Sequence, residues 1–301
     1  MKKSVGRPAL FFATNQINRG LSPVNAEKRS ILITGCSSGI GECVAKALHE
    51  RGYRVFASVR NPDDCASFEQ AGIECLVLDY ADSASIRSAV ELVLEQTGGR
   101  LYALFNNGAY GQPGACEDLS REAIRQQFET NVFGWMELTN HLIPIMRAQG
   151  HGRIIQNSSI LGFTAMSMRG AYNASKFAIE GFSDTLRLEL AGTDIHVSLI
   201  EPGPVASRFR ANAHHAFRQH IEVESSVHRE RYLKMIQRFE TSGNVQPFTL
   251  PPEAVLKRVV HALESNQPRI RYPVTFPTYL FTWLKRVLSD RMLDRILRRV
   301  G

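Results

Sequence analysis

From Ser30 onward, short apolar runs alternate with longer segments whose apolar residues recur every three or four positions. The runs are nearly continuous in Ile, Leu and Val, which is typical of parallel strands covered on both faces. The longer segments have the period of the helices that cover such a sheet. The pattern predicts an α/β fold, a single doubly wound parallel sheet of about seven strands with helices on both faces. The expected strands are 30–34, 53–59, 73–79, 101–106, 153–159 and 195–202, and the expected helices lie near 40–51, 83–96, 119–148 and 171–191.

The composition fits a soluble globular protein. The chain has 301 residues, enough for one large α/β domain or two small ones, with 44% hydrophobic and 22% charged side chains. Its five cysteines form no C-x-x-C pair, and its nine histidines show no H-E-x-x-H spacing. We therefore expect no disulfide framework, no zinc site or other metal site, and a reducing compartment, the cytoplasm. The cysteines are Cys36, Cys43, Cys65, Cys75 and Cys116.

The net charge of +7 is concentrated at the two ends of the chain. Residues 1–29 carry a net charge of +5 and residues 257–301 one of +7, so the part between them carries −5. Basic ends either favour an anionic membrane surface or simply keep the chain hydrated. There is no nucleic-acid motif, and no run approaches the ~18 apolar residues that cross a bilayer. We expect residues 1–28 to be a poorly ordered extension.

A glycine-rich stretch, "TGCSSGIG" (34–41), follows the first expected strand and opens the first helix. Gly35 permits a tight turn, Gly39 lets the backbone approach a pyrophosphate, and Gly41 permits close helix packing. The start of a helix also offers free N–H groups and a positive dipole end to phosphates. The spacing G-x-x-x-G-x-G differs from the G-x-G-x-x-G of the usual dinucleotide fingerprint. A plain connecting loop is the alternative, but the strand–loop–helix context favours a nucleotide site.

The end of the second strand offers a basic residue where an NAD site generally has an acidic one. Arg60 lies 19 residues after Gly41, about where a carboxylate binds the ribose 2′-hydroxyl of NAD. A guanidinium suits a 2′-phosphate, because it is permanently charged and offers paired donors. Arg60 therefore predicts NADP(H) rather than NAD(H), the alternative being a hydrated surface arginine.

Tyr172 and Lys176, one helical turn apart in "YNASK", form a candidate acid–base pair with Ser159 at the end of the fifth strand. Tyrosine is a poor acid–base catalyst at its ordinary pKa of about 10. A cation ~4 Å away, at an effective dielectric constant of ~20, lowers a pKa by ~3 units. We therefore expect Lys176 to bring the pKa of Tyr172 close to neutrality, while Ser159 holds a substrate oxygen. Each residue alone has a structural explanation, as a helix surface or a strand-end turn.

With these motifs, the chain from about Ser30 to about Arg271 resembles the short-chain dehydrogenase/reductase family. "TGCSSGIG" is similar to the family's T-G-x-x-x-G-x-G, and "YNASK" to its Y-x-x-x-K at the expected distance from Ser159. The resemblance implies a Rossmann-type fold and catalysis by Asn131, Ser159, Tyr172 and Lys176. Asn131 would hold a proton-relay water, and Ser159 and Tyr172 would contact the substrate. The implied cofactor-binding residues are Gly35, Ser37, Ser38, Gly39, Ile40, Gly41, Arg60, Asp79, Asn107, Gly108, Tyr172, Lys176, Pro202, Gly203 and Val205.

In one segment the chain departs from the family pattern. In "NNGAYG" (106–111), Gly108 and Ala109 exchange the last two residues of the usual N-N-A-G. We expect cofactor binding to survive, because in the family this segment contacts the cofactor mainly through its backbone. The neighbouring residues and the ending "RIRYPVTFPTYLFTWLKR" resemble a bacterial subgroup similar to retinol and steroid dehydrogenases, some of which reduce aldehydes with NADPH.

The resemblance implies NADP(H)-dependent reduction of an aldehyde or ketone, with a lipophilic substrate such as a long-chain aldehyde, retinal or a steroid. Two alternatives are an NAD(P)-dependent alcohol dehydrogenase that works oxidatively and a catalytically silent nucleotide sensor. The family resemblance also implies a homo-oligomer, a dimer or tetramer formed through the long fourth and fifth helices of the fold.

Two segments outside the motifs carry further expectations. Within a catalytic domain of residues 29–273, the long polar segment 204–250 is expected to form a mobile substrate lid. Residues 274–301 are expected to form a basic amphipathic helix, which either contacts the inner face of a membrane or packs on its own domain or a second subunit.

Overall fold

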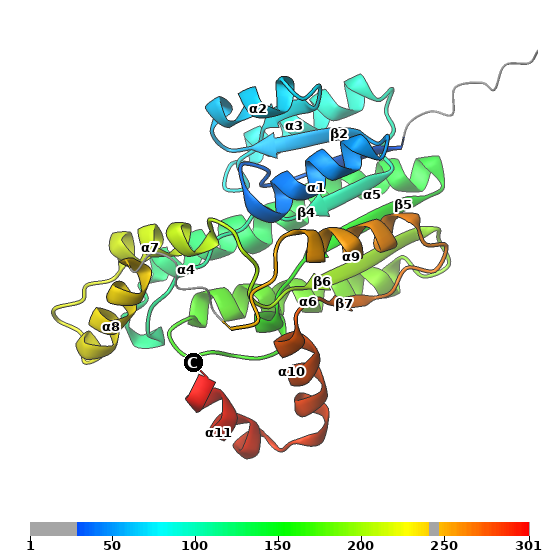
Figure 1. Ribbon diagram of the computed structural model, residues 1–301. Coiled ribbons are helices and arrows are strands. Elements are labelled where there is room, and N and C mark those ends of the chain that lie inside the picture. Colours follow the sequence, from blue (N-terminus) through cyan, green and yellow to red (C-terminus); the bar gives the residue numbers. More distant parts are fainter. Residues whose placement is uncertain (1–28, 241–246, 301) are drawn as a thin grey trace, which may run out of the picture.

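Seven parallel strands form one sheet in the order β3-β2-β1-β4-β5-β6-β7. The computed structural model describes residues 29–240 and 247–300 (Figure 1). The expected extension 1–28 lies outside these residues. The strands are β1 (Ser30–Ile33), β2 (Arg54–Val59), β3 (Glu74–Val77), β4 (Ala103–Asn106), β5 (Gly152–Asn157), β6 (Ile195–Glu201) and β7 (Arg271–Pro273).

Helices cover both faces of the sheet, as the sequence predicted. They are α1 (Gly39–Glu50), α2 (Ala66–Glu69), α3 (Ser83–Gln96), α4 (Arg121–Phe128), α5 (Gly134–Gln149), α6 (Gly170–Glu189), α7 (Phe209–His220), α8 (Arg229–Glu240), α9 (Glu253–Glu264), α10 (Phe276–Val287) and α11 (Asp290–Val300). Short helical turns are η1 (Pro62–Cys65), η2 (Cys116–Asp118), η3 (Glu129–Phe133) and η4 (Ile160–Gly162). The predicted α/β fold with a doubly wound parallel sheet is confirmed.

Apolar side chains on the two faces of each strand pack into two separate cores. In β1, Ile31 and Ile33 pack in the layer formed with α1 and α9. Leu32 points to the other face, where it packs with residues of α3, α5 and α6 such as Trp135 and Ile179. Successive strand residues point to opposite faces, so a run of consecutive apolar residues is what a sheet covered on both sides requires.

Several strands end earlier than expected. β3 ends at Val77 and β5 at Asn157, so Asp79 and Ser159 lie two residues beyond their strands. Both remain at the carboxyl edge of the sheet, where ligands bind in doubly wound folds. The expected helix 119–148 is three elements, because the π-helical turn η3 separates α4 from α5.

The cysteines were expected to form no disulfide framework, yet one pair of them forms a disulfide. Cys65, at the end of η1, and Cys75, in β3, form a disulfide between residues ten positions apart. The short turn through α2 returns the chain to β3 and brings the two Cα atoms to 5.5 Å. The cysteine pattern therefore gives no argument for a reducing compartment.

Segment 204–250, which the sequence predicts to be a mobile substrate lid, contains the two helices α7 and α8. A small apolar core holds these helices together, and the phenol of Tyr232 in α8 reaches η2. The Tyr232 hydroxyl accepts a hydrogen bond from the Ala115 backbone N–H (2.8 Å) and donates one to the Asp118 carboxylate (2.5 Å). Both helices are thus tied to the loop that follows β4.

The expected C-terminal helix is two helices, α10 and α11, separated at Leu288 and Ser289. In Figure 1 the pair extends below the sheet. No helix among the described residues is long and apolar enough to cross a membrane.

Candidate active site

The segments that follow β1 to β6 meet at the carboxyl edge of the sheet, and the candidate residues lie on these segments, on η3 and on α6. This edge brings together residues far apart in the sequence, from the glycine-rich loop at 34–41 to Pro202. Such an edge is the usual ligand site of an open parallel sheet.

The glycine-rich loop has the conformation that its glycines allow. Gly35 and Gly39 have φ values of +66° and +64°, which residues with a side chain rarely adopt. A Cβ atom on Gly35 would collide with the backbone of Gly108, and one on Gly41 would collide with the carbonyl oxygen of Gly35. The glycines therefore let this loop lie against the segment after β4.

The start of α1 is suited to bind a pyrophosphate. Ser38 is its N-cap residue, in extended conformation, and its side chain makes no capping hydrogen bond. Ser37, Ser38, Gly39 and Ile40 are partly exposed. The first N–H groups of a helix need partners from outside it, and phosphate oxygens can supply them.

Asn107 and Gly108 support the loop from the end of β4. The Asn107 side-chain amide donates to the carbonyl oxygens of Thr34 (2.9 Å) and Gly35 (3.2 Å). Trp135 donates its indole N–H to the Gly108 carbonyl (2.7 Å). A Cβ atom on Gly108 would lie only 3.2 Å from Gly35 N and from the Tyr80 ring. The exchanged order Gly108–Ala109 therefore suits a close approach of two backbones.

Arg60 directly follows β2 and is exposed. No hydrogen bond or ion pair joins its guanidinium to another described residue. Its positive charge reaches Tyr110: burial raises the pKa of Tyr110 to about 12, and Arg60 acts in the opposite direction. Asp79, nearby after β3, accepts a hydrogen bond from Ala81 N–H (2.9 Å). Arg60 is thus a cation available to an anionic group at the carboxyl edge of the sheet.

Lys176 is the most deeply buried of the candidate residues with a charge, only 1% exposed. Its ammonium group donates a hydrogen bond to the Asn157 carbonyl (2.8 Å) and lies 4.3 Å from the Trp135 ring centre. Burial lowers the pKa of Lys176 to about 7, and the charge of Glu180 acts against this shift. The residue thus changes its charge near neutral pH.

Tyr172 and Ser159 face one another across the end of β5. Burial raises the pKa of Tyr172 to about 12, while hydrogen bonding with the Ser159 hydroxyl and the charge of Arg169 lower it. The expectation that Lys176 brings this pKa close to neutrality is wrong here, because burial outweighs the charges and Lys176 Nζ is 5.8 Å from the Tyr172 ring centre. A phenol with this pKa is protonated at neutral pH and can serve as a proton donor.

Ser159 also joins the site to the segment after β6. Its hydroxyl donates a long hydrogen bond to the Pro202 carbonyl (3.5 Å) and accepts one from Leu161 N–H (3.1 Å). Gly203 lies against Thr275, just before α10, and Val205 pairs with Leu250 in an isolated parallel bridge. The expected Pro202–Val205 segment thus lies beside Ser159.

Asn131 lies in the π-helical turn η3 and is fully buried. Its side-chain amide donates to the Tyr110 carbonyl (2.9 Å) and to the Ser175 hydroxyl (3.1 Å), and its carbonyl accepts from Tyr110 N–H (3.2 Å). These contacts connect the loop after β4 to α6. The described contacts of Asn131 do not include Lys176.

One helical turn after Lys176 begins a partly buried charge network that the motifs did not reveal; Glu180 and Glu201 are buried in it, whereas Arg271 and Asp184 are about 40% exposed. Arg271 forms ion pairs with Glu180 (2.9 Å), Asp184 (2.8 Å) and Glu201 (3.3 Å). Burial raises the pKa of Glu180 and raises that of Glu201 to about 8, with the charge of Glu180 adding to the second shift. Glu180 follows Lys176 by one helical turn, a spacing visible in the sequence, but its partner Arg271 is 91 residues away.

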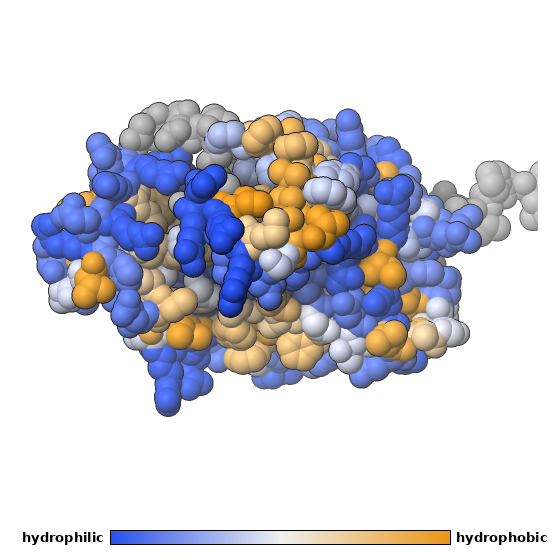
Figure 2. All heavy atoms as spheres, turned by 90° about the horizontal axis from the view of Figure 1, so that it is seen from below, coloured by the Kyte–Doolittle hydropathy of each residue, from blue (hydrophilic) through white to orange (hydrophobic). Residues whose placement is uncertain are grey.

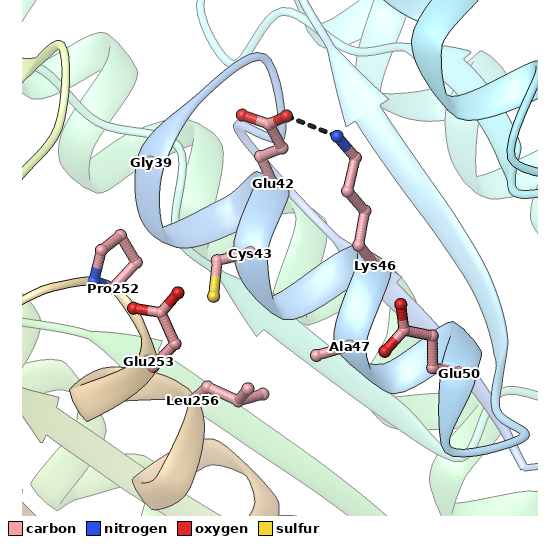
Figure 3. A pocket seen from close by; sticks show the side chains of 9 residues that line it. All are labelled: Gly39, Glu42, Cys43, Lys46, Ala47, Glu50, Pro252, Glu253 and Leu256. Carbon is pink, nitrogen blue, oxygen red and sulfur yellow. Dashed lines mark hydrogen bonds and ion pairs between the residues drawn. The ribbon is translucent and has the colours of Figure 1, made fainter.

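Two hollows on the surface are lined by residues other than Ser159, Tyr172 and Lys176, although the first of them reaches Gly39. The first is a groove of about 400 Å³ between α1 and α9. Figure 3 shows Glu42 and Glu253 on either side of Cys43 in this groove. Burial and these carboxylates raise the pKa of the Cys43 thiol, so it is a weak nucleophile. A second hollow of about 740 Å³ lies at the opposite, amino-terminal edge of the sheet. The residues that the structure describes contain no cluster of His, Cys, Asp and Glu able to hold a metal ion.

Comparison with known proteins identifies the family. The family described as short chain dehydrogenase matches residues 29–217. The chain is 40% identical to an Escherichia coli K12 protein named uncharacterized oxidoreductase YbbO over 271 residues, 90% of this chain and 94% of that protein. It is 30% identical to human retinol dehydrogenase 8 over 283 residues, 89% of this chain and 88% of that protein. The chain belongs to the short-chain dehydrogenase family and is an oxidoreductase.

Solved structures agree with this assignment. A short-chain dehydrogenase from Streptomyces avermitilis has a TM-score of 0.74 and 26% identity, covering 92% of this chain and 100% of that one. Other structures with this fold were determined with NADPH, in an actinorhodin polyketide ketoreductase, or with NAD, in a Burkholderia phymatum protein. The family resemblance noted in the sequence, including its likeness to retinol dehydrogenases, is confirmed.

Proposed function

We propose that this protein reduces a lipophilic aldehyde or ketone with NADPH, using Tyr172 as the proton donor. The observation that carries the proposal is the meeting of Ser159, Tyr172 and Lys176 at the sheet edge that also holds the glycine-rich loop. The NADPH-bound ketoreductase with this fold and the likeness to retinol dehydrogenase 8 support the reaction class and an apolar substrate.

The residues present fit a nicotinamide dinucleotide. The glycines leave a cradle that a Cβ atom would fill, and the first turn of α1 offers uncapped N–H groups. Ser37, Ser38, Gly39 and Ile40 would hold the pyrophosphate, Asp79, Asn107 and Gly108 the adenosine side, and Pro202, Gly203 and Val205 the nicotinamide side. Arg60 would bind the 2′-phosphate, which supports NADP(H) over NAD(H).

In this mechanism the chain orients the carbonyl group and supplies its proton. NADPH, when bound, supplies the hydride for the carbonyl carbon. Ser159 and Tyr172 donate hydrogen bonds to the carbonyl oxygen, which polarises the carbonyl bond. As charge develops on that oxygen, Tyr172 transfers its proton there, the products being the alcohol and NADP⁺. Solvent then reprotonates Tyr172.

Lys176 and Asn131 have supporting roles in this proposal. The Lys176 ammonium group would bind the nicotinamide ribose and stabilise the transient tyrosinate, so its charged form is the active one. Asn131 fixes the loop after β4 against α6 through Tyr110 and Ser175. The proposed proton-relay role of Asn131 requires a water molecule near Lys176.

We further propose a cytoplasmic homo-oligomer, a dimer or tetramer joined through α5 and α6. The cytoplasm is proposed because an NADPH-driven reduction needs a supply of the reduced cofactor. The oligomer is supported by exposed apolar side chains on α6 and η3, namely Phe177, Phe182, Leu188 and Phe133. Apolar patches of this kind mark contact surfaces between chains.

The experiment is NADPH and NADH consumption, followed by absorbance, with aldehydes and ketones that range from short alkyl compounds to retinal and steroid ketones. We expect faster turnover with NADPH and with long apolar aldehydes. In Tyr172→Phe, turnover should fall by about 100- to 10,000-fold while NADPH still binds. Cofactor binding without consumption across the panel would favour the nucleotide sensor, and turnover only of alcohols with NAD⁺ would favour the oxidative dehydrogenase.

A further inference from the structure

One face of α10 exposes a row of large apolar side chains. α10 buries only Thr278 and Phe281 among its twelve residues. On its other side, Phe276, Tyr279, Trp283 and Val287 are between 47% and 60% exposed. Their spacing of three or four residues puts them on one face of the helix. We refer to these four residues as the α10 row.

The surroundings of the α10 row are basic. Residues 276–300 contain six Lys or Arg against two Asp, a net charge of +4. On α11, Arg291, Arg295, Arg298 and Arg299 are all exposed, and none of residues 290–299 is buried. Figure 2, viewed from below the sheet, shows apolar and strongly hydrophilic side chains side by side on this face.

We propose that α10 and α11 bind the surface of a bilayer that contains anionic lipid. The α10 row would lie at the boundary between headgroups and acyl chains, where Trp and Tyr are favoured, and the arginines of α11 would lie on lipid phosphates. The helices are too short to cross a membrane, so the contact is peripheral.

Charge distinguishes this occupant from a second copy of the chain. Two copies that met through this face would each bring a net charge of +4, and like charges facing one another oppose association. An anionic bilayer complements both the charge and the apolar row. The combination of a basic face with Phe, Tyr and Trp is typical of helices that lie on membranes.

The proposed membrane face adjoins the candidate active site. Lys285 donates a hydrogen bond to the carbonyl of Phe163 (2.6 Å), four residues after Ser159. At the start of α10, Thr275 and Thr278 pack against Gly203, beside the nicotinamide side of the edge. If the proposed function holds, a lipophilic carbonyl dissolved in the bilayer has a short path to Tyr172. This consequence rests on the proposed function, whereas membrane binding does not.

The test measures binding of the full chain to vesicles of phosphatidylcholine, with and without phosphatidylglycerol. We expect the protein to sediment with vesicles that contain phosphatidylglycerol, and added salt to weaken the binding. The chain has two tryptophans: Trp135 is fully buried and Trp283 is 60% exposed. Binding should therefore shift the tryptophan emission to shorter wavelength and protect Trp283 from acrylamide.

Trp283→Asp should weaken vesicle binding at least about tenfold. The matched control is Val227→Asp, the same kind of change at an apolar residue that is 85% exposed in the turn between α7 and α8, and it should bind as wild type does. Thermal unfolding of both variants checks that each of them remains folded. A third variant, Arg295→Glu with Arg298→Glu, should lose binding while its α10 row stays intact.

Three results would overturn the membrane proposal. The first is no sedimentation with anionic vesicles, and the second is equal binding to vesicles of phosphatidylcholine alone. The third is a change of oligomeric mass in Trp283→Asp without vesicle binding by the wild type, which would assign the α10 row to a contact with a second copy. Turnover of a water-soluble aldehyde is measured in parallel. Turnover without vesicle binding refutes only the membrane proposal, and vesicle binding without turnover refutes only the proposed function.

Discussion

Phe209, the first residue of α7, lies edge-on against the ring of Tyr172, with the ring centres 5.3 Å apart. Its ring also lies close to Gly111, where a Cβ atom would be only 2.8 Å from Phe209 Cζ. Residues 111, 172 and 209 come from three separate segments of the chain, so this contact connects α7 to the candidate catalytic edge. Phe209 is therefore placed to form an apolar wall beside the proton donor.

We predict that Phe209→Ala lowers the affinity for long apolar aldehydes. Loss of an aromatic contact of about 0.5–1.5 kcal/mol together with buried apolar area should raise KM about tenfold. Short aldehydes, which do not reach the wall, should change little. Steady-state kinetics across a chain-length series checks this, with Leu92→Ala on the exposed side of α3 as control. Equal losses for short and long aldehydes would argue against a specificity role.

A second prediction concerns the cofactor. Arg60→Asp should raise the Kd for NADPH about 10- to 100-fold, because a charge-assisted hydrogen bond is replaced by repulsion of the 2′-phosphate. The Kd for NADH should change little. Fluorescence titration of both cofactors measures the two constants, and Arg87→Asp, an exposed change on α3, controls for the altered net charge. The proposed role of Arg60 fails if both cofactors weaken equally.

The sequence was sufficient to predict those parts of the fold that depend on local pattern. Alternation of apolar runs and helical periods located the sheet and its covering helices, and the glycine spacing located the loop before α1. Some errors had local signals that were missed: Ser289 and Asp290 are residues that begin helices, which is where the C-terminal segment divides into α10 and α11.

Other features depend on contacts between distant residues and have no local signal. The helices of segment 204–250 are stabilised by Tyr232, whose partners Ala115 and Asp118 lie more than a hundred positions earlier. The pKa of Tyr172 is raised mainly by burial in the folded protein. The sequence spacing between Tyr172 and Lys176 contains no information about that burial. Tertiary packing thus decided both outcomes.

The oligomer can be tested at Leu188, which is 71% exposed on α6. Leu188→Asp places a charge in the proposed contact between copies. This change should raise the dissociation constant of the oligomer at least about tenfold. Light scattering over a concentration series gives the mass of wild type and variant. Leu92→Asp, on the exposed side of α3, should leave the mass unchanged. A wild-type protein that is monomeric at all concentrations contradicts the proposal.

Glu180 should act on the reaction through Lys176. The charge of Glu180 opposes the effect of burial on the Lys176 pKa, so Glu180→Gln should lower that pKa further. Because the charged lysine is the proposed active form, the loss of kcat/KM with rising pH should occur at lower pH in the variant. Asp184→Asn is the matched control, since it removes another partner of Arg271 (2.8 Å). An equal shift in both variants would show that the network acts only through Arg271.

The buried Lys176 should reduce the stability of the fold. Its pKa falls from 10.5 to about 7 on folding because the ammonium group is desolvated. Below about pH 7 the folded protein carries the full cost of this buried charge. Between pH 7 and 10.5 the unfolded chain binds more protons than the folded one, so the cost fades as the pH rises.

Lys176→Met removes the charge at similar length, and should therefore raise the free energy of unfolding by a few kcal/mol at neutral pH. The lost hydrogen bond to the Asn157 carbonyl (2.8 Å) reduces this gain. Denaturant unfolding of wild type and variant from pH 6 to 10 should show a difference that is largest at pH 6 and shrinks toward pH 10. Lys46→Met on the exposed side of α1 should show no such trend. If Lys176→Met abolishes turnover yet stabilises the protein, the lysine is kept for its chemistry at the expense of stability; a destabilised variant would instead make Lys176 a structural residue.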